Sequence, residues 1–543
     1  METPSEDEAV VPLYLGLDLS TQQLKAVVVD DELKILHTAS VQFDSDLPEF
    51  RTHGGVVQNK LNSLVVTTPT LLWVKALDML MDRLTVCGVE FSKIVAISGT
   101  AQQHGSVFWY KGAEETLQKL DPSEFLHHQL ASCFSTSNSP VWMDSSTTVF
   151  CRQLEESVGG PKKLSEITGS RAYERFTASQ IAKVAKLNTD AYNNTERISL
   201  VSSFLCSLFL GKIAPIDYAD ASGMNIMDLQ TKQWNEKLLK VCGGADLEEK
   251  LGKPVVSYTN LGDISPYYVD RWEFSKDCKV IAFTGDNPAS MAGMRLGKGW
   301  LAISLGTSDT LILWLNERIV VTEGHIFCNP VDEDAYMGLL CYKNGSLTRE
   351  KIRDKCCDGS WEIFNHLLDS TPRGNFGNMG FYFATQEINP YLQGDYRFNK
   401  AGEKVLKFTS LEVEVRALIE GQFIAKRAHV EDIGFDFDEN TKILATGGAS
   451  KNHAILQVMA DVFNAPVYIQ ETSDSAMLGA AFQAKHGLHR PTDFFEITKC
   501  LPEPKLVCEP YTDSNEIYAP MVERYRKIAE ELETLVTPNY ATQ

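Results

Sequence analysis

GLDLSTQQLKAVV, residues 16–28, and AISLGTSDTLILW, residues 302–314, share one pattern. Each has an apolar strand, a polar tight turn that contains Thr with Ser or Gly, and then a second apolar strand. Short connections of this kind indicate antiparallel β-hairpins. Because the second copy comes about halfway along the chain, we expect two related halves. Hairpins resemble one another, however, so coincidence is the alternative.

Further strands and helices follow the first hairpin. Residues 34–43, 93–100 and 279–286 are predicted to be further strands, and the last two have apolar runs. Residues 67–84 carry apolar side chains on one face at helical spacing, with Thr68 as the expected N-cap. Strands mixed with helices of this length predict an α/β fold.

The length of the chain predicts more than one domain, because 543 residues are too many for one compact core. We expect two domains, at 12–292 and 293–543, so that the boundary falls shortly before the second copy of the repeated pattern. Residues 345–405 read as an inserted segment of surface helices and loops. Residues 1–11 read as an acidic, disordered tail, and residues 516–536 as a closing amphipathic helix.

Composition and charge exclude several classes of function. The 72 acidic and 51 basic residues give a formal net charge of −21. A chain this acidic repels nucleic acid and anionic membranes, so neither is expected as a partner. The apolar run at 200–211 is too short to span a bilayer and predicts a buried helix. Twelve dispersed cysteines suit reduced thiols, and the acidic start lacks a signal-peptide pattern, so we expect a cytoplasmic protein.

Phosphate binding would need a device other than the common glycine-rich loops. The segment GMRLGKG at 293–299 fails the spacing of the P-loop, and no GxGxxG follows a strand. The turns of the two hairpins are rich in Gly, Ser and Thr. Their backbone N–H groups and hydroxyls can hold a phosphate without a net positive charge.

Asp18 lies inside the first apolar strand, where an ionised carboxylate is costly unless it meets a cation or hydrogen-bond donors. The corresponding position in the second hairpin is Ser304. One acidic and one neutral position suit a single magnesium ion beside a triphosphate. The alternative is that Asp18 only accepts structural hydrogen bonds from its turn, and the hairpin alone does not separate the two interpretations.

Gly447 and Gly448 end another apolar strand, within ILATGGASKNHAILQVMADVF at 443–463. Adjacent glycines let a ligand approach the backbone closely. Ser450 is the expected cap of the helix that follows, whose N-terminus favours anionic or polar groups. The alternative is an ordinary turn between a strand and a helix.

Two more strand ends carry polar residues. In FTGDNPASMAG at 283–293, Asn287 is the expected helix cap and Pro288 fits the first helical position. Asp286 is not needed for that cap and is left to face a cleft. His104 follows the strand at 93–100, at an end where open α/β sheets usually bind ligands. A purely local structural role is the alternative for His104.

Two phosphate hairpins followed by a Gly-Gly turn resemble the actin-like ATPases. Within that superfamily the chain resembles the FGGY carbohydrate kinases, from about residue 12 to 535. One departure is TASQIAKVAK, where many members carry a Lys-x-x-Trp pattern, which weakens the transfer of roles to that segment. The motifs that carry the resemblance are VQFDSDLPEFRTHGG (41–55), SGTAQQHGSVFW (98–109), SPVWMDSST (139–147), GSRAYERFTASQIAK (169–183), DYADASGMNIMDL (217–229), TGDNPAS (284–290), ISLGTSDTL (303–311) and GGASKN (447–452).

The resemblance implies two ribonuclease-H-like domains facing a central cleft, with sugar bound by 12–292 and ATP largely by 293–543. Asp286 is implied to be the catalytic base that takes the proton of the sugar hydroxyl. The implied sugar-binding residues are His104, Arg175, Asp286 and Asn287. The implied ATP-binding residues are Asp18, Thr21, Gly306, Thr307, Ser308, Trp361, Gly447, Gly448 and Asn452, with Asp18 acting on Mg²⁺ through water. A surface salt bridge remains the alternative for Arg175, and packing remains the alternative for Trp361.

The expected activity is transfer of phosphate from Mg-ATP to the terminal 5-hydroxyl of D-xylulose. The partners are then a small sugar and ATP, with no nucleic acid and no membrane, and a monomer is expected. Ribulose, glycerol and gluconate are alternative acceptors for the same fold. A nucleotide-dependent actin-like binding protein and a catalytically silent sugar sensor are the alternatives from other classes of function.

Overall fold

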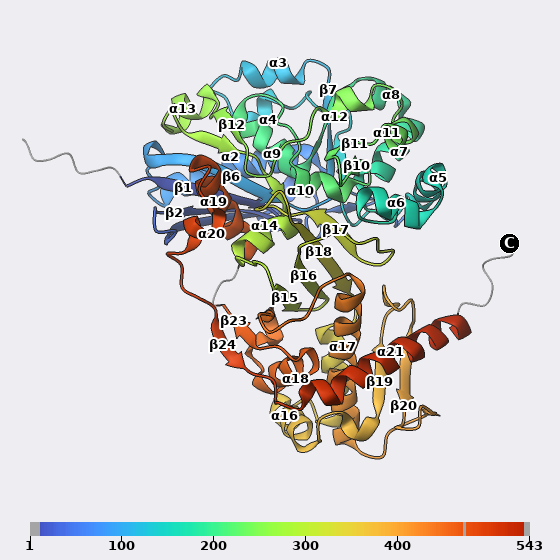
Figure 1. Ribbon diagram of the computed structural model, residues 1–543. Helices are drawn as coiled ribbons and strands as arrows, with labels where there is room; N and C mark the ends of the chain where they lie inside the picture. The colour runs from blue at the N-terminus through green and yellow to red at the C-terminus, as the bar shows by residue number, and fades with distance from the viewer. Residues whose placement is uncertain (1–10, 471–473, 537–543) are drawn as a thin grey trace, which may run out of the picture. The chain divides into compact units, whose positions relative to one another are not determined.

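The computed structural model describes residues 11–470 and 474–536 and divides into two compact units (Figure 1). Of the tail predicted at residues 1–11, all but Val11 lie outside the described residues. The units interleave along the chain, and no sequence pattern pointed to this return of later segments to the first unit. Unit 1 contains residues 11–295, 326–336 and 474–502, and unit 2 contains residues 296–325, 337–470 and 503–536.

Unit 1 is built on a mixed sheet, and the strands predicted around the first hairpin are confirmed. The strand order is β12 (Asn260–Asp263), β13 (Lys279–Ile281), β6 (Ile94–Ala101), β1 (Leu13–Leu19), β2 (Gln23–Val29) and β3 (Ile35–Gln42). β1 pairs antiparallel with β2 and parallel with β6. The strand predicted at 279–286 is broken, because β13 and β14 (Thr284–Gly285) pair separately with β6.

Unit 2 repeats this arrangement, which confirms the internal duplication at the level of strand order. Its sheet contains β18 (Tyr336–Tyr342), β16 (Asp309–Leu315), β15 (Trp300–Leu305), β22 (Lys442–Thr446), β23 (Val467–Ile469) and β24 (Lys505–Cys508), in that order. The second hairpin, β15 with β16, is antiparallel, and β15 then pairs parallel with β22. The outer pairs agree as well, since β23 with β24 is antiparallel like β13 with β12.

The predicted helices are present, and the first of them differs from its prediction at its start. α2 (Thr70–Val86) begins after Pro69, so Thr68 is not its cap. Thr68 stays extended in β5 (Val66–Pro69), because that strand pairs with β8 (Asn138–Pro140), and its hydroxyl donates to the carbonyl of Gly55. The apolar run at 200–211 forms the fully buried α9 (Val201–Leu210). No helix in the described part of the chain is long and apolar enough to cross a membrane.

The segment at 345–405 differs from the prediction of helices and loops alone. It contains α15 (Ser346–Cys356) and α16 (Trp361–Ser370), but also a three-stranded sheet. The strands are β19 (Met379–Phe383), β20 (Gly394–Phe398) and β21 (Lys404–Val405). β19 consists of Met, Gly and three aromatic residues, and all five are buried. It pairs antiparallel with β20, so this part of the segment is not a surface loop. The closing helix α21 (Ser514–Val536) matches its prediction.

The helix that begins at Asp286, α14 (Asp286–Gly293), packs on α19 (Ser475–Leu488) within unit 1. Glycines make this contact one of backbone against backbone. A Cβ on Gly479 would lie 1.9 Å from the carbonyl oxygen of Ala289, and one on Gly293 would lie 1.8 Å from that of Ser475. No side chain fits at either distance, so these glycines set the position of α14.

We expect Gly479→Ala to destabilise the protein by about 3 kcal/mol, because the added methyl must push two helices apart. Helix propensity alone predicts the opposite sign, a gain of about 1 kcal/mol. Thermal and urea denaturation measure the change. Gly88→Ala is the control, since its Cβ meets nothing within 4 Å at a φ of +79°, and it should cost about 1 kcal/mol. Wild-type stability for Gly479→Ala would contradict this packing argument.

Candidate active site

Asp18 ends β1 as a buried carboxylate whose charge is compensated from the facing strand. Its Oδ2 accepts from Ser20 Oγ at 2.8 Å and lies 3.2 Å from Lys25 Nζ. Lys25 is opposite Asp18 in the hairpin register and also lies 2.6 Å from Asp474. Burial raises the pKa of Asp18, and Lys25 opposes that shift. Among the described residues, Asp18 Oδ1 has no hydrogen-bond partner.

This orphaned oxygen fits a shared site for a divalent cation. The described ranges 11–470 and 474–536 contain no group of three or more His, Cys, Asp or Glu side chains that could hold a metal ion by itself. Mg²⁺ in nucleotide sites usually keeps several waters and takes one or two carboxylates with substrate phosphates. Asp18 Oδ1 could supply such a carboxylate. Thr21, in the adjoining turn, accepts from Trp142 Nε1 at 2.8 Å.

Asp286 is the first residue of α14, and the prediction that Asn287 caps this helix is wrong. The cap position is Gly285, which is still paired in β14, so the helix begins two residues earlier than expected. Asn287 instead turns its amide aside, and Nδ2 donates to Asp286 Oδ1 at 3.2 Å and to Gln103 Oε1 at 2.9 Å. The backbone N–H of Asn287 also donates to Asp286 Oδ1, at 2.9 Å.

The electrostatic surroundings of Asp286 suit a base. Burial and the neighbouring Asp18 raise the pKa of Asp286 to about 7. A general base works best when its pKa lies near the working pH. Both hydrogen bonds from Asn287 go to Oδ1, and the backbone N–H of Gln103 is a further donor that favours the charged carboxylate.

His104 is held as a neutral ring. It is 7% exposed, and it stacks on Phe176 with the ring centroids 4.3 Å apart. Burial and the charge of Arg175 lower the pKa of His104 to about 3. Its Nδ1 lies 2.9 Å from the carbonyl oxygen of Gly223. Because a carbonyl only accepts, Nδ1 carries the proton and Nε2 is an acceptor, suited to a ligand hydroxyl.

Arg175 lies on a backbone segment that is fixed on both sides. Its guanidinium lies 4.7 Å from the ring centroid of Tyr173 and 5.4 Å from that of Phe176. Thr177 Oγ1 donates to the carbonyl of His104 at 3.0 Å, which ties the segment to the neighbouring loop. The carbonyl oxygen just before Arg175, that of Glu174, accepts from Thr147 (2.7 Å), Ser179 (3.2 Å) and Gln180 (2.9 Å).

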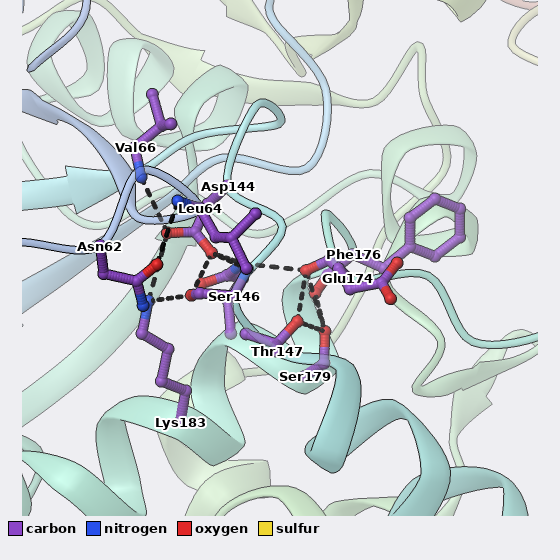
Figure 2. Close-up of polar contacts among 11 residues, drawn as sticks. Asn62, Leu64, Val66, Asp144, Ser146, Thr147, Glu174, Phe176, Ser179 and Lys183 are labelled. Carbon is purple, nitrogen blue, oxygen red and sulfur yellow. Dashed lines mark hydrogen bonds and ion pairs between the residues drawn. The ribbon is translucent and has the colours of Figure 1, made fainter. Parts of the chain in front are cut away.

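Figure 2 shows the network behind this segment, in which Asp144 is the central acceptor. Asp144 is 1% exposed and accepts from Val66 N, from Ser146 N and Oγ, and from Gln180 Nε2. Lys183 Nζ lies 3.2 Å from Asp144 and donates to Ser146 Oγ. Burial opposes ionisation, but the hydrogen bonds from Ser146 and Gln180 hold the pKa of Asp144 below its usual value. A charged buried hub therefore fixes the backbone that carries Arg175.

Unit 2 holds a pocket of about 630 Å³ beside the second hairpin. Five of the predicted ATP-binding residues line it, namely Gly306, Thr307, Trp361, Gly448 and Asn452. Ser308 and Gly447 are sequence neighbours of lining residues but are not in the lining itself. The five come from the β15–β16 turn, the start of α16 and the turn after β22, so the fold gathers three distant segments.

The cap of the helix beside this pocket was predicted wrongly. A 3₁₀ turn at Gly448–Lys451 follows the two glycines, so α18 (His453–Phe463) starts later than expected. Asn452 is the cap, and its Oδ1 accepts from Ile455 N at 3.3 Å. Ser450 Oγ instead donates to the carbonyl of Gly447 at 2.7 Å. The turn adds backbone along the pocket wall.

Comparison with known proteins places the chain in a family. Models of the FGGY family of carbohydrate kinases match it, the N-terminal domain at residues 136–293 and the C-terminal domain at residues 301–488. The xylulose kinase of Rattus norvegicus is 54% identical over 520 residues, which cover 95% of this chain and 96% of that protein. Xylulose kinase 2 of Arabidopsis thaliana is 48% identical over 487 residues, 88% of this chain and 87% of that protein.

The chain belongs to the FGGY family of carbohydrate kinases. The crystal structure of xylulose kinase from Rhodospirillum rubrum has a TM-score of 0.79 at 15% identity, covering 96% of this chain and 99% of that one. At that identity the likeness shows the fold alone, which is the two-domain α/β fold of the actin-like ATPases. This chain is therefore a kinase that uses ATP and acts on an alcohol group.

The kinase has a buried cluster of charges beneath its second hairpin turn. Asp309 begins β16 and is bound by both guanidinium nitrogens of Arg349, at 2.9 and 3.0 Å. Lys426 Nζ lies 3.0 Å from the same carboxylate, and all three side chains are buried. Burial opposes ionisation, but Lys426 and Arg349 lower the pKa of Asp309. Burial lowers the pKa of Lys426, and the neighbouring Asp309 and buried Glu387 oppose that shift.

Several residues of these sites were missed from the sequence. Lys25 could have been found, because the hairpin register places it opposite Asp18. Asp144 stands among serines in SPVWMDSST, but no periodicity marks it as buried. Arg349 and Lys426 lie far from Asp309 in the sequence and carry no local signal, since long-range ion pairs depend on tertiary structure.

We expect Asp309→Asn to cost about 3–5 kcal/mol of stability, because it leaves two buried cations facing an amide. ATP should also bind at least about tenfold more weakly, because Arg349, which donates to the carbonyl of Gly306, loses the carboxylate that holds it. Lys426→Met is the matched comparison and should cost less, because it leaves a neutral Arg–Asp pair. Melting temperature and calorimetric titration with ATP measure both effects. Equal losses in the two variants would contradict the charge argument.

Proposed function

We propose that this kinase transfers the γ-phosphate of ATP to the 5-hydroxyl of D-xylulose, giving D-xylulose 5-phosphate. The observation that carries the chemistry is Asp286, a carboxylate with a pKa of about 7 whose contacts with Asn287 are all made by Oδ1. We assign the accepted proton to Oδ2. The choice of sugar rests on the two relatives described above, which are named as xylulose kinases and match nearly the whole chain.

The proposed step is a proton transfer coupled to phosphoryl transfer. The sugar O5 forms a bond to the γ-phosphorus as the bond from that phosphorus to the β,γ-bridging oxygen breaks, and ADP leaves. The proton of the 5-hydroxyl goes to Asp286 Oδ2. Such reactions depend mainly on positioning and on electrostatic stabilisation. Asp18 would hold Mg²⁺ through water, and the ion would neutralise charge on the phosphates.

The sugar would be recognised through paired hydrogen bonds in unit 1. His104 Nε2 would accept from one hydroxyl, Arg175 would donate to another, and Asn287 Oδ1 would accept from a third. A buried polar site of this kind rejects analogues that leave its groups unpaired, often by several orders of magnitude. The fixed segment around Arg175 supports this role, because a pre-positioned donor loses less entropy on binding.

ATP would occupy the pocket of unit 2, with its phosphates along Gly306, Thr307 and Ser308. Gly447, Gly448 and Asn452 would border the adenosine. Trp361 begins α16 at the pocket wall, with the Arg353 guanidinium 4.8 Å from its ring centroid, so its ring would lie beside the adenine. The Arg349 guanidinium, which lines the pocket and donates to the carbonyl of Gly306 at 3.4 Å, supports the placement of the phosphates. We also propose a cytoplasmic monomer, which light scattering on the purified protein would test.

We expect Asp286→Asn to lower kcat by roughly 10²- to 10⁴-fold while D-xylulose still binds, because the amide keeps the shape but cannot take the proton. Steady-state kinetics and calorimetric titration with the sugar separate the two effects. Asp461→Asn is the control, since Asp461 is a buried carboxylate of raised pKa in α18, outside the proposed machinery. It should keep turnover within about twofold. Near-normal turnover in Asp286→Asn would remove Asp286 as the base.

The pH dependence follows from the same carboxylate. Below about pH 7 Asp286 is protonated and cannot accept the hydroxyl proton, so kcat should fall on the acid side of that pH. Because its folded-state pKa is raised above 3.8, its ionisation costs stability as the pH rises through this window. Asp286→Asn should therefore melt at a higher temperature than the wild type at pH 8. A flat kcat between pH 5 and 8 would contradict the assignment.

The acceptor is tested by ADP release with Mg²⁺ and ATP across D-xylulose, ribulose, glycerol and gluconate. D-Xylulose should give the highest kcat/KM. If another compound does, the specific acceptor is wrong and the kinase chemistry stands. If none of a broad polyol panel is phosphorylated, the proposed reaction fails.

A further inference from the structure

Gln103 lies between the candidate base and a second, deeper carboxylate. It lies two residues after the end of β6 and is 3% exposed. Its Oε1 accepts from Asn287 Nδ2 at 2.9 Å, and its Nε2 donates to Asp220 Oδ1 at 3.3 Å. The carbonyl end of the amide thus accepts a hydrogen bond, and its NH₂ end donates one.

Asp220 determines which way round this amide lies. It is 1% exposed, it belongs to α10 (Tyr218–Ala221), and its Oδ2 accepts from Ser202 Oγ at 2.6 Å. Burial and the adjacent Asp217 raise the pKa of Asp220. An oxygen that accepts must face the NH₂ end of Gln103, so the carbonyl end is directed to Asn287.

The orientation of Asn287 depends in turn on Gln103. One hydrogen of Asn287 Nδ2 goes to Gln103 Oε1, and the other goes to Asp286 Oδ1. If the Gln103 amide were reversed, two NH₂ groups would face each other, and Asn287 would rotate. Asp286 would then lose a donor, and Asn287 would present NH₂ where it now presents a carbonyl oxygen.

Gly285 leaves the space that this arrangement needs. A Cβ at position 285 would lie 2.4 Å from Gln103 Cγ and 2.6 Å from Asp220 Oδ1. The residue before Asp286 therefore packs directly on the contact between Gln103 and Asp220. The backbone at the start of α14 and the hydrogen bonds that link Asp220, Gln103 and Asn287 are therefore packed together.

We propose that Gln103, oriented by Asp220, is a positioning residue that fixes Asn287 and thereby aims Asp286 Oδ2 at the acceptor hydroxyl. This inference rests on the proposed function and names a residue that acts through others rather than on the substrate. It places the specificity of the acceptor site partly in a buried layer, behind the residues that would contact the sugar.

The main test is Gln103→Met, which keeps the length of the side chain and removes both hydrogen bonds. We expect kcat to fall by about 10- to 100-fold with the KM for ATP unchanged. The acid limb of the kcat profile should move to higher pH, because the Asp286 carboxylate loses the Asn287 donor that favours its charged form. Asp18 on β1 and Asp220 on α10 face Asp286, Lys25 on β2 is paired with Asp18, and α19 meets α14 through glycine and alanine backbone.

Gln483→Met is the matched control for loss of a buried glutamine. Gln483 is 1% exposed in α19, and its Nε2 donates to the carbonyl of Pro330 at 2.8 Å. Both variants should lose similar melting temperature, while only Gln103→Met changes kcat and its pH profile. A Gln103→Met enzyme with wild-type kcat and pH profile would overturn the proposal. A large rise in the KM for the sugar at normal kcat would also overturn it, since Gln103 would then be a sugar ligand.

The role of Asp220 is tested by two variants of similar size that differ in hydrogen bonding. Asp220→Asn keeps an acceptor for Gln103 and should retain kcat within about threefold, whereas Asp220→Leu should reproduce the defect and the shifted acid limb of Gln103→Met. Equal loss in both variants would make Asp220 a structural residue only. If the wild type phosphorylates no sugar, the proposed function fails. If the wild type is active and Gln103→Met is equally active, only the inference about Gln103 fails.

Discussion

A carboxylate at the inner end of a buried strand is the constraint on which unit 1 depends. An ionised Asp18 in the apolar β1 strand would be unfavourable without a cation, and Lys25 on the paired strand supplies one. The hairpin register that joins the two residues therefore also decides the charge balance of the site. Ser20 and Lys25 both contact Oδ2 of Asp18, and Oδ1 has no partner among the described residues. The folded strand therefore presents this carboxylate oxygen to the site.

The two units treat charge in opposite ways at equivalent hairpins. Unit 1 gathers carboxylates, and burial raises the pKa values of Asp18, Asp220 and Asp286. A neighbouring carboxylate adds to the shift in each case, Asp474 for Asp18, Asp217 for Asp220 and Asp18 for Asp286. Unit 2 begins its second hairpin strand with Asp309 but surrounds it with two cations. An overall charge of −21 thus does not by itself exclude an anion from unit 2, because the charges nearest to a turn decide what that turn favours.

The fold was largely predictable from the sequence because its decisive elements are local. Apolar strands, tight turns and helical faces gave the hairpins, most strands and the α/β class, and the topology repeats as expected. The errors at Thr68 and Asn287 come from strand pairing before the helix, and the error at Ser450 comes from an extra 3₁₀ turn. Each moved the helix start by one or two residues. Contacts between distant residues, such as Asp144 with Lys183 or Asp309 with Lys426, leave no local pattern and needed the structure.

The return of α19 to unit 1 has a consequence for the order in which the chain folds. α14 emerges from the ribosome early, yet the glycine-lined surface that it packs against is made only when residues near 488 are synthesised. At typical elongation rates that delay is roughly 10–40 s. During that time the helix that begins at Asp286 lacks its packing partner. Unit 1 is therefore completed only after most of unit 2 has been translated.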